Sequence, residues 1–249
     1  QVKNYRPMNK FMAANMFTFT PIKHLSFSVG NSIIYAEQTI QAAYLIPIAF
    51  YKSLDHLLTK GLITQNQNSQ VFASLSVRPV KHLQLYGSFY LDEFSIKRLK
   101  PSNQENNPIS YLVGFNWSGW PIKGLSLKGE FMRSYIACYT HSIDALTWQS
   151  NSFDMGHYMG DNAQSIYAEL AYRPTRGMLI KMSYTHDTKY NSYAYLRRYR
   201  TATEDIRDGG ISETLAQKPF DHAIFRNEVL RLDGIYEVHP NMYLTLALE

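Results

Sequence analysis

One stretch of the chain, residues 138–161, gathers side chains that could act as acids, bases or ligand contacts: CYTHSIDALTWQSNSFDMGHYMGD. Histidine near aspartate can perform general acid–base catalysis, so an outer-surface hydrolase is one interpretation of this stretch. However, no serine stands in a nucleophile-elbow pattern, and neither HExxH nor a paired metal-ligand spacing occurs. Hydrogen bonding between this loop and the rest of the protein explains the same residues. We therefore predict a protein that is not an enzyme, with no catalytic residue, cofactor or metal.

Two basic runs and a group of tyrosines suggest ligand binding instead. Arg197 and Arg198 belong to the second run, which tyrosines surround, and Lys97 and Arg98 belong to the first. Guanidinium groups bind phosphates and carboxylates, as in lipopolysaccharide or an acidic glycan, and tyrosine rings can stack on sugars or anchor at a lipid interface. A solvated loop edge accounts for the charge equally well. The predicted ligand contacts are Tyr139, His141, Trp148, His157, Arg197 and Arg198.

Composition narrows the class of protein. The chain has 249 residues, 19 of them Tyr and 13 Phe, and no apolar run of about 18 residues that could form a transmembrane helix. Its one cysteine, Cys138, excludes an internal disulfide. The net charge of +5 permits acidic glycans or lipid phosphates as neighbours, but no nucleic-acid-binding motif accompanies it. We predict no nucleic-acid partner.

A turn recurs four times at uneven spacing and divides the chain into hairpins. Residues 20–25 read TPIKHL, 78–83 RPVKHL, 120–125 WPIKGL and 173–178 RPTRGM. Proline suits the first corner of a tight turn, and the His or Gly three residues later tolerates positive φ. A fifth, looser turn is expected at 239–241. The predicted strands around the five turns are 9–20, 25–37, 68–78, 83–95, 109–119, 125–137, 162–173, 178–188, 225–238 and 242–249.

These strands alternate apolar and polar residues, and their connections differ in length at the two ends. In 83–92, Leu83, Leu85 and Phe89 oppose Gln84 and Ser88, whereas in the first strand Asn15 shares a face with Phe17 and Phe19. Connections at one end have about four residues, whereas those at the other span about 38–67, 96–108, 138–161 and 189–224. A helix is expected over 48–60, packed over the barrel mouth or inside the lumen.

This asymmetry favours an all-β fold. We predict an antiparallel transmembrane outer-membrane β-barrel, or a large part of one, with short periplasmic turns and long extracellular loops. Charged residues of both signs on the polar face predict a lumen crossed by ion pairs. A soluble β-barrel or sandwich is the alternative, because a period of two fits any half-buried sheet.

The segments GEFMRSYIACYTH at 129–141 and FDMGHYMGDNAQSIYAELAYRPTRGMLIKMSYTHD at 153–187 resemble the outer-membrane capsule-assembly family Wzi. The quoted motif residues are Tyr139 to His141, then Gly156, His157, Gly160, Asn162 and Ala163. YLIPIAFY at 44–51 and LQLYGSFYLDEFS at 83–95 also look like family segments.

The resemblance implies an 18-stranded outer-membrane barrel that retains capsular polysaccharide at the cell surface as a lectin. Residues 1–249 would form one barrel domain with about ten of those strands, the C-terminal portion of a longer protein. The expected partners are membrane lipid, lipopolysaccharide, surface polysaccharide and other outer-membrane proteins. Two alternatives stay open: an accessory barrel in a multiprotein outer-membrane complex for secretion, gliding or nutrient uptake, and a porin.

Overall fold

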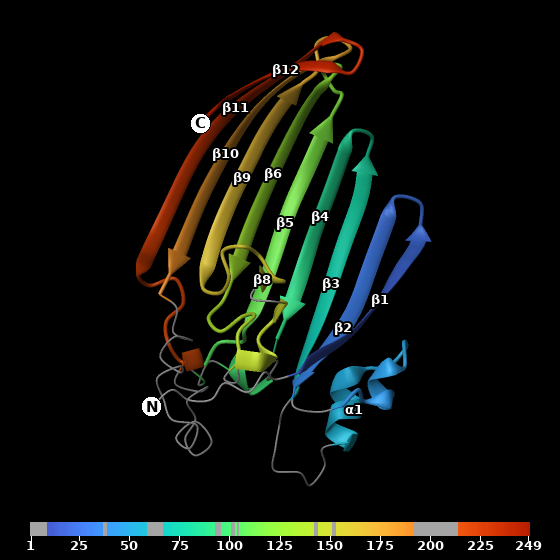
Figure 1. Ribbon diagram of the computed structural model, residues 1–249, viewed down its shortest axis with the longest axis vertical. Coiled ribbons are helices and arrows are strands. Elements are labelled where there is room, and N and C mark those ends of the chain that lie inside the picture. Colours follow the sequence, from blue (N-terminus) through green and yellow to red (C-terminus); the bar gives the residue numbers. More distant parts are fainter. Residues whose placement is uncertain are drawn as a thin grey trace.

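Ten strands form one antiparallel sheet in which every strand pairs with its neighbours in chain order (Figure 1). The computed structural model describes residues 9–36, 39–58, 67–92, 96–100, 103, 105–141, 144–150, 153–191 and 214–249. The strands of the sheet are β1 (Lys10–Ile22), β2 (Leu25–Ala36), β3 (Gln67–Val80), β4 (Leu83–Leu91), β5 (Ile109–Ser118), β6 (Leu125–Ser134), β9 (Ala163–Tyr172), β10 (Met178–Tyr190), β11 (Ala223–His239) and β12 (Met242–Leu248). All ten predicted strands and all five hairpins are confirmed.

The recurring turn has the backbone that its sequence predicts. The residue three positions after each proline is left-handed, with φ of 78° at His24, 74° at His82, 83° at Gly124 and 82° at Gly177. Asn241 closes the fifth hairpin with φ of 65°. These turns all lie at one end of the sheet, here called the turn end, and the long connections lie at the other, the loop end (Figure 1).

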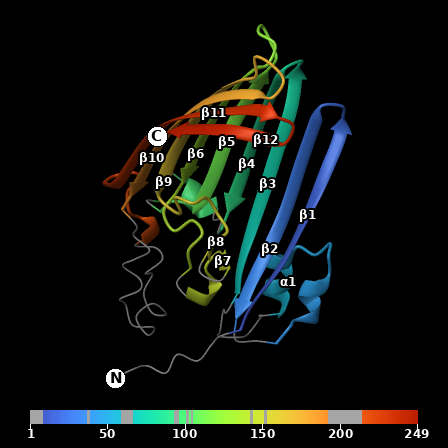
Figure 2. The ribbon, with the colours of Figure 1, turned by 45° about the horizontal axis from the view of Figure 1, so that its top comes forward.

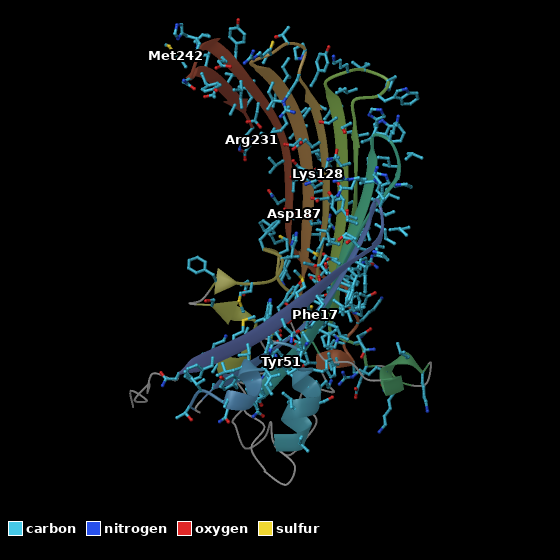
Figure 3. The ribbon with its side chains drawn as sticks, turned by 90° about the vertical axis from the view of Figure 1, so that its right-hand side faces the viewer. Phe17, Tyr51, Lys128, Asp187, Arg231 and Met242 are labelled. Carbon is cyan, nitrogen blue, oxygen red and sulfur yellow. The ribbon has the colours of Figure 1, made fainter. Side chains whose placement is uncertain are left out.

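The two faces of the sheet differ sharply in chemistry. On one face, Ser28, Ser74 and Ser88 are in line across β2, β3 and β4, and Ser165 and Asp187 pair across β9 and β10. This polar face is the hollow side of the curved sheet, which Figure 3 shows from the β1 side. The opposite, outward face is apolar and exposed, and its side chains include Phe27, Leu75, Leu85, Phe89, Leu127, Ile166, Leu170, Ile180, Met182, Leu230, Leu232 and Tyr236.

Ion pairs cross the polar face midway along the strands, as the mixed charges predict. Lys128 Nζ lies 3.1 Å from Glu130 Oε1, and Lys181 Nζ lies 3.3 Å from Asp233 Oδ2. Arg231 Nε donates to the other oxygen of Asp233 at 2.9 Å. Because these groups neutralise each other, the polar face carries no broad field of a single sign along these strands.

Short elements fill the loop end. The predicted helix over 48–60 is present as α1 (Tyr51–Leu58), preceded by the 3-10 turn η1 (Ala42–Leu45). The others are η2 (Ile96–Leu99), η3 (Asp144–Leu146) and the small hairpin β7 (Gln149–Ser150) with β8 (Phe153–Asp154). Within the described ranges, no helix is both long and apolar enough to cross a membrane.

The sheet is open. Its edge strands are β1 and β12, and in the described residues neither has a second partner (Figure 2). The ten strands therefore form a curved wall and not a closed cylinder.

Candidate functional site

The connection between β6 and β9, described at residues 135–141, 144–150 and 153–162, folds back over the polar face and is called the strap here. Its two ends meet where Asn162 N donates to Tyr135 O at 3.1 Å. Asp161 fastens the base: its Oδ2 accepts from Ala137 N at 3.0 Å, and its Oδ1 lies 2.8 Å from Lys189 Nζ on β10. Asp161 is 4% exposed, so the strap is attached to the wall by a buried charge pair.

The strap buries a small aromatic core against the loop end of the sheet. Ile34 and Ala36 of β2 contact Cys138, Tyr139, Leu146 and Trp148 in one cluster. Lys10 of the edge strand β1 donates to Thr147 O at 2.6 Å and Gln149 O at 2.7 Å. The strap is thus fixed to β1 and β2 on one side and to β10 on the other, and it spans the hollow of the sheet.

A pocket of about 390 Å³ lies between the strap and the polar face. From the sheet, Met16, Phe72, Ser88, Tyr90, Ser110 and Met132 are among its lining residues, and from the strap Tyr139, Trp148, Met155, Gly156 and His157. The pocket is therefore lined mainly by aromatic rings and methionine side chains, with serine hydroxyls between them.

Tyr90 stands at the centre of the aromatic group. Its ring centroid lies 4.7 Å from that of Tyr139 and 5.5 Å from that of Trp148, both tilted arrangements. Its hydroxyl oxygen is buried and has no hydrogen-bond partner among the described residues. A buried hydroxyl without a partner is costly, because its desolvation is not offset. A ligand or a water in the pocket would supply the missing partner.

Tyr139 and Gly156 are fitted to each other. Tyr139 has a left-handed backbone with φ of 71° and is 6% exposed. A Cβ on Gly156 would lie 2.6 Å from the Tyr139 ring, so only glycine allows these two segments of the strap to approach each other this closely. Burial raises the pKa of Tyr139, and hydrogen bonds from Ser110 and the His157 backbone oppose that shift in part. The phenol is therefore neutral at physiological pH.

His157 is held as a neutral imidazole. Burial lowers its pKa, and the carboxylates of Asp187 and Glu130 raise it to a smaller extent. Its Nδ1 accepts from Met159 N at 3.3 Å, which assigns the proton to Nε2. The ring lies 4.3 Å from that of Tyr158, whose hydroxyl donates to Asp187 Oδ1 at 2.8 Å.

Three of the six predicted contact residues come together here: Tyr139, Trp148 and His157 all line the pocket. His141 does not line it; its backbone N–H donates to Thr147 Oγ1 at 3.4 Å. Arg197 and Arg198 lie outside the described residues. In the other basic run, Arg98 pairs with Glu105 at 3.1 Å.

Sequence reasoning missed the sheet half of the pocket, above all Tyr90 and Ser110. The available signal was the alternation itself, because both residues fall on the polar face at the loop end, directly opposite each other in the register of β4 and β5.

The described side chains include no group of three or more His, Cys, Asp or Glu that could hold a metal. Comparisons with protein-family models, curated proteins and solved structures find no match to this chain. Fold and pocket together define an all-β protein with a strap-covered pocket on the polar face of its sheet.

Proposed function

We propose that this chain is part of an outer-membrane β-barrel that binds surface polysaccharide without covalent attachment, as its resemblance to the Wzi family implies. The observation that carries the proposal is the division of one ten-stranded sheet into an exposed apolar face and a polar face. A wall of this kind is stable where hydrocarbon covers one side and water the other.

The height of the apolar band, which is close to that of a transmembrane barrel, supports this proposal. On β11 it runs from Leu230 to Val238, eight steps that give about 27 Å along the strand and about 21 Å after a tilt of about 40°. The band on a transmembrane barrel is about 25 Å tall. In this protein, the apolar band of β10 and β11 ends toward the loop end at His186, which pairs with Glu228 at 3.0 Å.

Membrane insertion requires that both sheet edges be paired. Unpaired backbone groups in hydrocarbon are too costly, so β1 and β12 must each bond to a further strand. The proposal therefore includes additional strands that close the cylinder, and it makes the polar face the lining of its lumen.

The pocket suits a short segment of glycan. Its volume of 390 Å³ lies at the small end of the range for ligand sites, about 300–1,000 Å³. Tyr139 and Trp148 contribute aromatic atoms to the pocket lining, which suits contact with the apolar side of a sugar ring. Ser110, the Tyr90 hydroxyl and the neutral His157 offer donors and acceptors for sugar hydroxyls. These groups support binding and orientation, so we propose a lectin and not an enzyme.

The proposal is tested by titrating the reconstituted protein with capsular polysaccharide. The polysaccharide is purified from the organism that makes this protein. Trp148→Ala removes the aromatic face and is expected to weaken binding about 10- to 100-fold. Trp120→Ala is the matched control, because Trp120 is 58% exposed at the turn end. Trp148→Phe keeps most of the packing and separates lost stacking from a displaced strap. Absence of binding to any surface polysaccharide would exclude the lectin function.

A second candidate is an accessory barrel in a multiprotein outer-membrane complex. The two open edges favour it, because a strand of another chain could pair with either one. Extraction in mild detergent distinguishes the candidates: a fixed partner that co-purifies in constant ratio supports the accessory role.

A further inference from the structure

Residues 39–58, called the outer segment here, lie on the face of the sheet opposite to the strap. The segment contains η1 and α1 and packs on the outward side chains of β1 and β2, which include Phe11, Ala13, Ile33 and Tyr35. Figure 3 shows α1, marked by Tyr51, beside the crossing strands β1 and β2 at the loop end. The predicted positions over the mouth or inside the lumen are wrong, because Ile33 and Tyr35 belong to the outward row of β2.

Two asparagines hold this segment in place. Asn31 Oδ1 accepts from Tyr51 N at 2.8 Å, and its Nδ2 donates to Ala49 O at 3.2 Å and to Asn15 Oδ1 at 2.7 Å. Asn15 Nδ2 donates to the same Ala49 carbonyl at 2.8 Å. This explains why Asn15 shares a face with Phe17 and Phe19: its amide satisfies backbone groups where the chain enters α1.

The outer segment carries large apolar side chains on both of its sides. Its inner side is buried, with Tyr44 and Tyr51 each 2% exposed against the sheet. Its other side is open, although large apolar side chains occupy it: Ile48 76%, Leu57 71%, Leu45 67%, Ile40 62%, Phe50 50% and Ile46 46% exposed. Lys52 is the one charged residue of this segment whose side chain the structure describes. Water alone is a poor environment for such a surface.

We propose that the outer segment lies at the boundary between the lipid headgroups and the acyl chains, with its open apolar side chains in the acyl region, where it anchors the wall in the outer leaflet. This inference rests on the proposed membrane location. Lipid fits better than a protein partner because the open side chains continue the exposed apolar band of β1 and β2, which includes Phe17, Phe19 and Phe27. The aliphatic part of the Lys52 side chain can lie along the apolar surface while its ammonium group reaches the headgroup level.

The asparagine contacts favour the same environment. Irregular backbone exposed to lipid does not occur in the hydrocarbon core, so this segment belongs at the headgroup boundary, where fewer of its backbone groups need partners inside the protein. Asn15 and Asn31 supply such partners at the entry to α1. Because the strap and the outer segment occupy opposite faces, one molecule can bind glycan in the lumen while this helix contacts lipid outside.

Spin labels in the reconstituted full-length protein test the inference. Ile48→Cys is labelled with a nitroxide, and the collision rates with oxygen, which partitions into lipid, and with a water-soluble nickel chelate are compared. Leu127→Cys, on the outward face of β6, is the lipid reference, and Lys123→Cys, in a tight turn, is the water reference. Native Cys138 is fully buried, so unmodified protein serves as the labelling blank. Phe50→Cys repeats the measurement if the first variant folds poorly.

The inference predicts an oxygen-to-nickel ratio at Ile48→Cys close to that of Leu127→Cys and well above that of Lys123→Cys. A ratio equal to the Lys123→Cys value would overturn it, since the segment would then face water. Low collision with both reagents would also overturn it, because a protein partner would then cover the segment. If Leu127→Cys itself faces water, the proposed membrane location fails, whereas a lipid-exposed Leu127→Cys confines the failure to the outer segment.

Discussion

The buried pair of Asp161 and Lys189 is expected to control how often the strap opens. Asp161→Ala removes the acceptor for Ala137 N–H and the carboxylate that lies 2.8 Å from Lys189 Nζ. Breaking a buried ion pair costs about 3–5 kcal/mol. That range is reduced here because the Lys189 side chain is 19% exposed and also donates to the Asp161 carbonyl oxygen. We expect strap closure to be weakened by about 2–4 kcal/mol.

Cys138 provides the assay. It is the chain's one cysteine, it is 0% exposed where the strap packs on the sheet, and its thiol reacts only when the strap opens. Burial also raises the pKa of Cys138, so the closed state keeps it as the unreactive thiol. At a factor of ten per about 1.4 kcal/mol, Asp161→Ala is expected to label with a maleimide about 30- to 1,000-fold faster than the unmodified protein.

Two further variants make this result specific. Asp161→Asn keeps an oxygen acceptor without the charge and should give an intermediate rate. Asp221→Ala removes a carboxylate whose contacts are exposed, with Lys218 at 3.9 Å and His222 at 3.4 Å, and should change the rate by less than about fivefold. If Asp161→Ala labels no faster than Asp221→Ala, the charge pair does not hold the strap.

Other perturbations of the site and the outer segment have equally definite outcomes. Burial lowers the pKa of His157 in the folded strap, so as the pH falls the unfolded strap binds a proton before the folded strap does. The contribution of the neutral His157 to the stability of the folded strap is therefore fully present above about pH 6.5 and is lost as the pH falls further. Near-ultraviolet circular dichroism should weaken over that range, and His157→Gln should flatten the response. Gly156→Val forces the Tyr139 ring from its place in the pocket, at an overpacking cost of about 1–3 kcal/mol. If this cost falls on the binding site, glycan binding should weaken about 5- to 150-fold, while the ten-stranded sheet stays folded. Asn31→Leu leaves the Tyr51 N–H without its acceptor and Asn15 Oδ1 without its donor, so a spin label at Ile48→Cys should become more mobile; unchanged mobility would mean that burial of Tyr44 and Tyr51 suffices.

The fold could be predicted largely because local chemistry specifies it. Proline and a left-handed His or Gly mark each hairpin, and alternation over ten residues assigns each face. The open edges could not be predicted, since the pairing of an edge strand depends on residues far apart in sequence.

The site could be predicted only in part. Tyr139, Trp148 and His157 were identified because aromatic and imidazole side chains concentrate in the strap. Tyr90 and Ser110 were missed because a strand residue becomes a pocket residue only when a distant loop folds over it. His141 has the same chemistry as His157, yet it does not line the pocket, and no spacing rule predicts that difference.

The central claim is that one face of the sheet contacts hydrocarbon and the other contacts water. A photoreactive lipid, activated after reconstitution of the unmodified protein and followed by mass spectrometry of the peptides, tests it most directly. Labels are expected with a period of two, on Leu85, Leu127, Met182 and Leu232, and none on Gln84, Lys128 or Ser183. Labels on both sets, or a protein that stays in water without taking up label, would contradict it.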